Sequence, residues 1–518
     1  MIPTGVEKLP ISKWTNKHEN FTHKLKMGSS FSLYNPPGTT RRERYLATTR
    51  NFQWLINYAK KHEIKLRAMG SGWSFTKVGL SPDGIVNTSP LNFSFPITAK
   101  YTSQKYKNTP ADLYFVQCGT LIYELNRRLA SRNDARSIKA SGASNGQTLA
   151  GATATGTHGA AFKFGAVHDA IVGIHLVNGS DKHVWIERES YPVASKNFLK
   201  WLDADVIRDD DVFNSVVVGF GSFGFIHGLM IETSPIFLLE EHRLGNLPYN
   251  DALKKAMRTL DFSSLNIEPE EEDKSLYHFE VLFNIHEKVD NPSNRDAFLK
   301  YIYKKPYTTD YIPVKHSELF TYGEDLAGII STVLDALGPS SEKLIPTLVN
   351  QMFSLAFKPT PPQTGTLGEI FNYTKFRGKI ASCAIGITAE NSPRVVDAII
   401  EINKKHSFPG GLAFRYVKGT SAVLGFTRFK QTCVLEMDGI ESLGARRFYA
   451  AVWDHLEKEQ IKYTLHWGKI NFNLNEERLK WMYGEEAFGL WKKVREELLP
   501  GSTKAIFENE FMKQCGLD

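Results

Sequence analysis

The densest glycine series of the chain, between residues 141 and 177, constrains the fold more than any other feature. It ends in a strand-like apolar segment, residues 171–177, and contains one histidine, His158. Because glycine has no Cβ, backbone N–H groups in such a run can closely approach an anion or a flat ring. A long flexible loop is the alternative. Alanines rather than charged residues separate the glycines, which favours a cradle for a flat, phosphorylated ligand. The glycines are Gly142, Gly146, Gly151, Gly156, Gly159 and Gly165.

Two further glycine-rich segments flank this series. A short strand, residues 64–69, runs directly into the turn GSGWSF at residues 70–75. Its spacing is neither GxGxxG nor GxxxxGK[ST], which excludes the Rossmann and P-loop interpretations. The other segment, residues 216–232, is predicted to form a strand, a tight turn and a strand, because a helix would lose about 1 kcal/mol at each glycine.

The length and charge of the chain restrict its class. With 518 residues, it is long enough for two or three domains. The net charge of +7 is spread along the sequence, so nucleic-acid binding has little support, whereas an anionic small molecule would be attracted. The N-terminus lacks the apolar core of a signal peptide, and no apolar run of ~18 residues is present. We therefore expect a cytoplasmic protein without a membrane span.

The four cysteines are far apart and form no CxxC pair: Cys118, Cys383, Cys433 and Cys515. This spacing indicates neither a zinc site nor a disulfide framework. We expect buried free thiols and no bound metal.

The periodicity of apolar residues predicts an α+β protein with a domain boundary near Pro235, where glycines become rarer and charged and aromatic residues more frequent. The proline-rich segment 358–366 is expected to be a loop. Two strongly apolar helices, 325–337 and 344–357, could be plain core or an apolar wall over a binding site. The other predicted helices are 47–63, 121–130, 394–406, 442–460 and 481–497, and the other predicted strands are 113–118, 379–389, 412–417 and 432–437.

Four motifs in order resemble those of the vanillyl-alcohol oxidase/p-cresol methylhydroxylase superfamily of FAD proteins. They are the glycine turn after a strand (67–74), GATATGTHG (151–159), GFGSFGFI (219–226) and HWGK (466–469). The last is similar to a motif of the sugar-lactone and alditol oxidases. Together the motifs span most of the chain, which makes the resemblance more specific than any one of them.

The resemblance implies an FAD-binding domain of two α+β subdomains over residues 1–235, a cap domain over 236–473 and a C-terminal segment, 474–518, that returns to the FAD domain. It implies that residues of the 69–74 turn wrap the pyrophosphate and that Gly224 and Ile226 lie by the adenine half. His466 would also touch the flavin. The implied FAD contacts in the turn and in the glycine series are Met69, Gly70, Ser71, Gly72, Trp73, Ser74, Gly142, Gly146, Gly151, Thr155, Gly156, Thr157, His158 and Gly159.

The chain departs from the family pattern at two positions. Relatives with covalent flavin carry His where this chain has Trp73, so we predict non-covalent FAD, although another histidine could reach the ring. Relatives also carry an ExR strand in the cap. Here the corresponding residues are Ala413 and Arg415, so the carboxylate is missing and Glu436 is the candidate replacement.

A flavin-dependent oxidation needs cations near the reduced ring and a group that takes the hydroxyl proton. Arg415 and Lys469 are the predicted cations. His466 is the first candidate for proton transfer, because an unperturbed imidazole titrates near neutrality. A structural role for His466 is the alternative, and His158 is assigned to the cofactor cradle.

Three functions remain open. The first is FAD-dependent oxidation of a CH–OH group on an alditol, a sugar lactone or a more hydrophobic alcohol, with O2 or another electron acceptor. The second is oxidative cyclisation on the same fold, and the third is non-catalytic FAD binding. A small-molecule substrate and a monomer or small homo-oligomer are expected.

Overall fold

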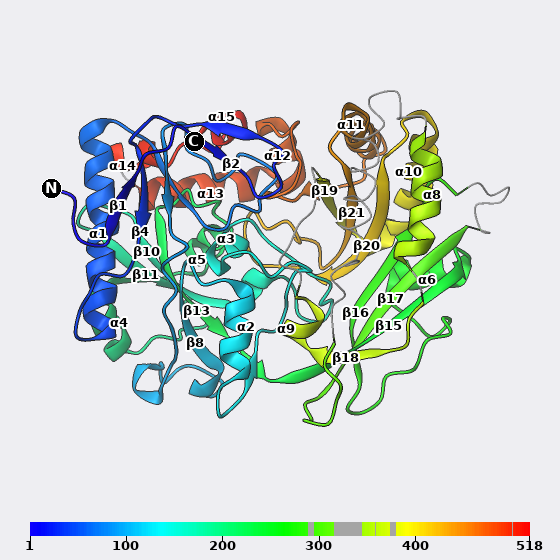
Figure 1. Ribbon diagram of the computed structural model, residues 1–518, viewed down its shortest axis with the longest axis horizontal. Coiled ribbons are helices and arrows are strands. Elements are labelled where there is room, and N and C mark those ends of the chain that lie inside the picture. The colour runs from blue at the N-terminus through cyan, green and yellow to red at the C-terminus, as the bar shows by residue number, and fades with distance from the viewer. Residues whose placement is uncertain (288–294, 315–343, 358, 373–379, 500) are drawn as a thin grey trace.

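The computed structural model describes residues 1–287, 295–314, 344–357, 359–372, 380–499 and 501–518. Its elements form two lobes that lie side by side in Figure 1. One lobe holds the N-terminal part and the C-terminal helices, and the other holds the large eight-stranded sheet, which we call the cap sheet. Helices and sheets are mixed in both, which confirms the predicted α+β class. Among the described helices, none combines the length and apolar character needed to cross a bilayer.

Two larger sheets form the first lobe. One has the order β1-β4-β6-β5 and the other β12-β11-β10-β13-β8-β7. The long helix α1 (Arg41–His62) begins before the predicted residue 47, because Thr40 and Glu43 form a capping box. The strands are β1 (Val6–Leu9), β4 (Ser30–Leu33), β5 (Leu66–Met69), β6 (Gly84–Asn87), β7 (Ser94–Pro96), β8 (Leu113–Gln117), β10 (Ile171–Val177), β11 (His183–Glu187), β12 (Asp205–Arg208) and β13 (Phe225–Glu232). Helices α2 (Ile122–Ala130) and α4 (Lys196–Leu202) also belong to this lobe.

The second lobe is built on one antiparallel sheet of order β18-β15-β17-β16-β20-β21-β19-β22. Helices α10 (Ser392–Lys405) and α11 (Leu443–Lys458) pack on one face with α6 (Asp251–Thr259), and α8 (Ile345–Ala356) packs on the other. The strands are β15 (Phe237–Pro248), β16 (Ser275–Phe283), β17 (Asp296–Pro306), β18 (Gln363–Thr366), β19 (Ile380–Thr388), β20 (Gly410–Lys418), β21 (Gln431–Ile440) and β22 (Tyr463–Leu465), and the short helix α9 (Leu367–Ile370) follows β18.

Several secondary-structure predictions were wrong. The glycine series contains a short helix, α3 (Leu149–Ala154), capped by the Thr148 hydroxyl. The segment 216–232 begins as the end of helix α5 (Asp210–Val216) and only its second half, β13, is a strand. Part of the proline-rich segment forms strand β18, which extends the sheet edge beside β15. The predicted helix 344–357 is confirmed as α8, whereas the predicted helix 325–337 lies outside the described residues.

The C-terminal helices return to the first lobe, where Figure 1 places α14 (Ser502–Ile506) beside α1. The predicted helix 481–497 is in fact two, α12 (Glu476–Tyr483) and α13 (Glu485–Leu498), because Gly484 adopts a φ of +86°. Arg495 on α13 donates to the Ser222 carbonyl at 3.1 Å. Helices α14 (Ser502–Ile506) and α15 (Glu510–Gln514) follow, and Asn509 caps α15 while donating to the Leu80 carbonyl at 2.8 Å.

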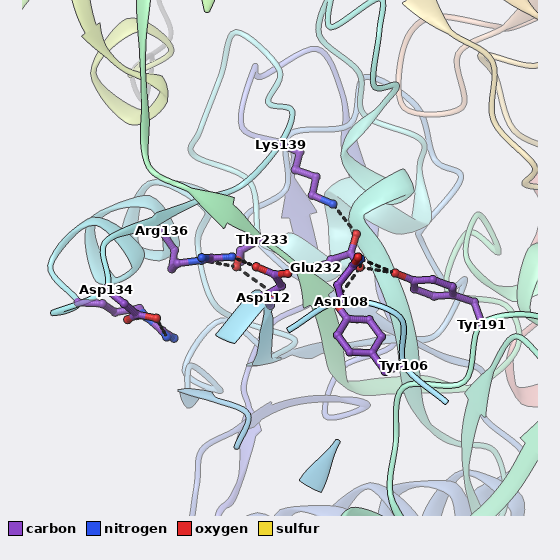
Figure 2. Close-up of polar contacts among 10 residues, drawn as sticks. Tyr106, Asn108, Asp112, Asp134, Arg136, Lys139, Tyr191, Glu232 and Thr233 are labelled. Carbon is purple, nitrogen blue, oxygen red and sulfur yellow. Dashed lines mark hydrogen bonds and ion pairs between the residues drawn. The ribbon is translucent and has the colours of Figure 1, made fainter. Parts of the chain in front are cut away.

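A polar cluster holds the chain where it passes from β13 into the cap sheet (Figure 2). At the end of β13, the Glu232 carboxylate accepts hydrogen bonds from Tyr191 at 2.6 Å and Tyr106 at 2.8 Å, and also contacts Asn108 and Lys139. The next residues form β14 (Ser234–Pro235), which pairs with β9 (Arg136–Ser137). We call Glu232, its four partners and the β9–β14 pairing the hinge clamp; the partners are Tyr106, Asn108, Lys139 and Tyr191.

Candidate active site

Segments from both lobes line one cavity. The turn after β5, helix α3 and the turn before β13 line it from the first lobe, and β16, β20, β21 and β19 line it from the cap sheet. Most of the predicted cofactor contacts face it: Met69, Gly70, Ser71, Gly72, Trp73, Ser74, Gly142, Gly151, Thr155, Thr157, His158, Gly224, Ile226 and His466. Arg415 and Lys469 also line it.

Three of the predicted contacts, Gly146, Gly156 and Gly159, do not line the cavity. A Cβ on Gly146 would lie 2.4 Å from Cζ2 of Trp73, and one on Gly159 would lie 2.0 Å from the Ser141 carbonyl oxygen. Gly156 has a φ of +73°, which disfavours other residues. Gly146 and Gly159 therefore allow neighbouring segments to pack closely, whereas Gly156 allows the backbone to turn.

The turn at residues 70–74 offers donors suited to a pyrophosphate. Within the described parts of the chain, no backbone carbonyl accepts from the N–H groups of Ser71, Gly72 and Ser74. Gly72 has a φ of +73°, so the backbone turns sharply there. Successive N–H groups in such a turn form an anion-binding concavity. The residues present therefore fit a dinucleotide cofactor.

An N-terminal hairpin, β2 (Lys13–Thr15) and β3 (Thr22–Lys24), closes over this turn and was missed in the sequence. The Lys17 N–H donates to the Gly72 carbonyl at 2.8 Å, and Trp14 lies against Gly72. His18 lines the cavity, stacks on Phe75 with 4.2 Å between ring centroids, and meets Trp73 edge-on. The residues next to His18 in the sequence are mostly polar and carry no motif. Only the tertiary contacts show that this hairpin covers the glycine turn.

Arg415 and Lys469 meet one shared carboxylate on the cap sheet. Arg415 Nη1 lies 2.5 Å from Glu436 Oε2, and Lys469 Nζ lies 2.6 Å from Glu436 Oε1. Arg415 Nε also donates to Glu280 Oε1 at 2.7 Å. The register pairs Ala413 with Glu436, so the carboxylate missing from β20 is supplied by the adjacent strand. We call Glu280, Arg415, Glu436 and Lys469 the charged row.

Burial and mutual attraction decide the charge states in this row. Burial alone would raise the pKa of Glu436, but Arg415 and Lys469 outweigh it and hold that pKa well below its usual range. Burial alone would lower the pKa of Lys469, and Glu436 with Asp438 outweighs it and raises that pKa. The pKa of Arg415 is likewise raised because Glu280 and Glu436 outweigh burial. The cations remain charged, and much of their charge is balanced by the paired carboxylates.

Two of the histidines that line the cavity, His158 and His466, are neutral near pH 7. Burial is the main cause that lowers the pKa of His158 to about 4 and the pKa of His466 well below 6.5. The Gly468 N–H donates to Nδ1 of His466 at 2.9 Å. In the neutral ring, Nε2 then carries the proton, so His466 is arranged to donate a hydrogen bond there rather than to accept a proton.

Apart from Ser382, Gly411 and Asp438, the rest of the cap side of the cavity is apolar. Leu282, Leu412 and Ala413 line it from the sheet, and Phe353 and Phe357 line it from the α8 side. Leu282, Ala413 and the two phenylalanines belong to one buried apolar cluster. The predicted helix 344–357 thus both packs in an apolar cluster and lines the cavity, so it combines features of the two alternatives that the sequence left open.

Outside the cavity, Glu240, His242 and Glu268 lie close enough together to share a cation. Lys274 Nζ already lies 2.8 Å from Glu240 Oε1 and also contacts Glu268. This lysine supplies positive charge to the acidic group.

Comparison with known proteins agrees with this geometry. The family model described as "FAD binding domain" matches residues 44–187. D-arabinono-1,4-lactone oxidase of Saccharomyces cerevisiae is 27% identical over 183 residues, which cover 35% of this chain and 30% of the yeast protein. L-gulono-1,4-lactone dehydrogenase of Mycobacterium tuberculosis is 25% identical over 188 residues, which cover 36% of each chain. The matches thus span about a third of these relatives.

Solved structures match over nearly the whole chain. Cholesterol oxidase of Brevibacterium sterolicum superposes with a TM-score of 0.70 at 12% identity, covering 98% of this chain and 97% of that one. A VAO-type flavoprotein of Myceliophthora thermophila gives a TM-score of 0.57 at 13% identity, covering 92% and 79%. These matches confirm the predicted fold. The chain therefore has the fold of these flavoproteins, and its residues 44–187 are similar to the FAD-binding-domain model.

Proposed function

We propose that this protein uses FAD to oxidise a CH–OH group of a bulky, mainly apolar alcohol. One observation carries the proposal: the turn with donors for a pyrophosphate and the charged row on the cap sheet line the same cavity. A cofactor site facing buried cations and carboxylates is the arrangement that an alcohol oxidation needs.

The bound FAD would supply the two-electron oxidant that takes the hydrogen on the carbinol carbon. The turn at residues 70–74 would hold the pyrophosphate, and Gly224 and Ile226 would contact the adenine half. Arg415 and Lys469 would hold the hydroxyl group and supply positive charge. The paired carboxylates Glu280 and Glu436 keep both cations in place.

The apolar wall supports a hydrophobic alcohol over a polyol. A polyol would bury several hydroxyl groups against Leu282, Phe353 and Phe357, each at a cost of about 1–3 kcal/mol without a partner. The structural neighbour is named as a cholesterol oxidase, which is compatible with a bulky substrate. Sugar lactones form the second candidate class, because the curated relatives are named for them.

The proposal includes non-covalent FAD. Trp73 stands in the glycine turn and packs over Gly146, so the position of the expected histidine carries no imidazole. Acid precipitation of the purified protein should release all flavin into the supernatant. A yellow pellet would contradict non-covalent binding and direct attention to His18, the histidine beside Trp73.

The domain limits also stay part of the proposal: FAD domain 1–235, cap 236–473 and returning segment 474–518. Support comes from the cap sheet, whose strands all lie between Phe237 and Leu465, and from the contacts of Arg495 and Asn509 with the first lobe. A cytoplasmic location is proposed on the four buried, unpaired cysteines.

Anaerobic mixing with an alcohol panel tests the function. The yellow protein should bleach with long-chain or polycyclic secondary alcohols and more slowly with sugar lactones or alditols. If only lactones bleach the protein, its substrates are sugar lactones rather than bulky apolar alcohols. No bleaching with any alcohol or lactone would leave oxidative cyclisation or non-catalytic FAD binding, and product analysis with cyclisable metabolites would separate those two.

A further inference from the structure

A third carboxylate, that of Asp438, faces the cavity beside the charged row. It lies two residues along β21 from Glu436 and therefore on the same face of the sheet. The Asp438 side chain is 23% exposed, whereas those of Glu436 and Glu280 are 4% and 0% exposed. Asp438 is thus the acidic group of this face that a small molecule in the cavity can reach.

The other two carboxylates are fully engaged. Glu280 contacts Arg415 through Oε1 and His278 through Oε2, and Glu436 contacts Lys469 through Oε1 and Arg415 through Oε2. A proton on either would replace a buried ion pair, which is strongly unfavourable. Neither group is suited to accept the proton of a substrate.

Asp438 is held differently. Its Oδ1 accepts a hydrogen bond from the Ser382 hydroxyl on β19 at 2.5 Å, and Lys469 Nζ lies 3.9 Å from the same oxygen. In the described part of the chain no donor contacts Oδ2. The residue opposite it on β20 is Gly411, which has no side chain to cover it. One oxygen is therefore fixed and the other remains available as an acceptor.

The surroundings also favour a proton on this group over one on its neighbours. Burial is the main cause that raises the pKa of Asp438, and Glu436 adds to it, while Lys469, Ser382 and Arg415 oppose the rise. In contrast, the pKa of Glu436 is lowered. Among the three carboxylates, the proton exchanges most easily at Asp438.

We propose that Oδ2 of Asp438 accepts the hydroxyl proton of the substrate alcohol. The assignment rests on the proposed function and names the acid–base residue of that site. The O–H bond breaks and its proton binds Asp438, while the carbinol C–H bond breaks and its hydrogen and electron pair pass to FAD as the oxidant. A carbonyl product remains, and Asp438 returns the proton to solvent before the next turnover.

The variant Asp438→Asn tests this role in the FAD-loaded protein. Anaerobic bleaching by an active alcohol should slow by about 100-fold or more, because the proton acceptor is lost. The wild-type rate should rise with pH to a plateau, and the variant should lose that rise. Asp454→Asn, whose side chain is 70% exposed on α11, is the matched control and should behave as wild type.

Infrared spectroscopy gives a second measurement that does not depend on turnover. The wild-type protein should show the C=O band of a protonated carboxyl that vanishes with rising pH along the same curve as the rate. Asp438→Asn should lack this band. If that variant does not fold, Ser382→Ala serves instead, because loss of a donor to the ionised form should shift both curves to higher pH.

The outcomes separate the two claims. Equal bleaching rates and pH profiles for wild type and Asp438→Asn would overturn the assignment of Asp438 but not the proposed function. Unshifted curves in Ser382→Ala, or an infrared band that persists in Asp438→Asn, would also overturn the assignment. A wild-type protein that no alcohol bleaches would overturn the proposed function and the role of Asp438 with it.

Discussion

At the scale of single residues, the carboxylate that pairs with the two cations lies on β21, whereas the family resemblance implies it on β20. Ala413 stands where the resemblance implies a glutamate, and Glu436 lies directly opposite on β21 and contacts both cations. The short side chain of Ala413 leaves room for this arrangement. The sequence pointed to Glu436 as a candidate replacement, but only the strand register shows that the two positions are neighbours.

Restoring the missing glutamate should therefore be harmful. Ala413→Glu would bury a second carboxylate opposite Glu436, and we expect the free energy of unfolding to fall by at least ~2 kcal/mol. The double variant Ala413→Glu/Glu436→Ala should recover most of the loss, since one carboxylate again serves the cations. Urea unfolding measures both. Ala413→Gln controls for side-chain size, and an equal loss with Gln would show that charge is not the cause.

At the scale of elements, apolar periodicity located most helices and strands but missed interruptions. The run that predicts one helix over 481–497 keeps its apolar spacing on both sides of Gly484, although the backbone turns there. Likewise, α5 and β13 share a continuous apolar segment whose halves adopt different structures. The backbone has a positive φ at Gly484 in the first case and at Phe220, Gly221 and Gly224 in the second, and periodicity does not report backbone conformation.

Two glycines near this break form a matched pair. No atom lies within 4 Å of a Cβ placed on Gly484 or Gly489, so substitution affects the backbone alone. Gly484→Ala should destabilise the protein by about 1–3 kcal/mol because its φ of +86° is unfavourable for alanine. Gly489→Ala, inside α13, should stabilise it by about 0.5–1 kcal/mol. Thermal unfolding of both variants checks the opposite signs.

At the scale of the whole molecule, the cavity depends on how the cap sheet is held over the first lobe. The chain crosses between the lobes at the hinge clamp, where Glu232 gathers donors from Tyr106, Tyr191 and Lys139 (Figure 2). Burial would raise the pKa of Glu232, but its hydrogen bonds outweigh this and lower it to about 2. The clamp therefore holds an ionised carboxylate at neutral pH.

Removing this carboxylate should loosen the connection between the lobes. Glu232→Ala leaves two tyrosine hydroxyls and a lysine without their acceptor, and we expect a loss of about 2 kcal/mol in the free energy of unfolding. Limited proteolysis should become faster at residues 233–236. The exposed Glu189 offers a control through Glu189→Ala, which should change neither measurement. Unchanged proteolysis in Glu232→Ala would show that the clamp does not restrain the crossing.

The buried histidines should make the whole protein sensitive to mild acid. Burial lowers the pKa of His158 from 6.5 to about 4, and the pKa values of His175, His227 and His466 lie well below 6.5. At a pH between these lowered values and 6.5, the unfolded chain binds more protons than the folded protein. The free energy of unfolding therefore decreases as the pH falls below 6.5.

For His158 alone the loss should amount to about 3 kcal/mol by pH 4. Urea unfolding across this pH range should show a shallower slope for His158→Asn than for wild type. His62→Gln, at the exposed end of α1, should keep the wild-type slope. Equal slopes for all three proteins would contradict a buried, neutral His158.

The sequence by itself determined the class of the protein: glycine turns, their order along the chain and the HWGK motif indicate an FAD fold, because these features depend on local backbone chemistry. It also identified Arg415, Lys469 and most of the cavity glycines. Only the tertiary structure decided which groups meet. Strand register places Glu436 opposite Ala413. Packing between distant segments brings the N-terminal hairpin against Trp73 and leaves Asp438 exposed beside two paired carboxylates. Residue spacing along the chain does not predict these contacts, because they join segments that are far apart in the sequence.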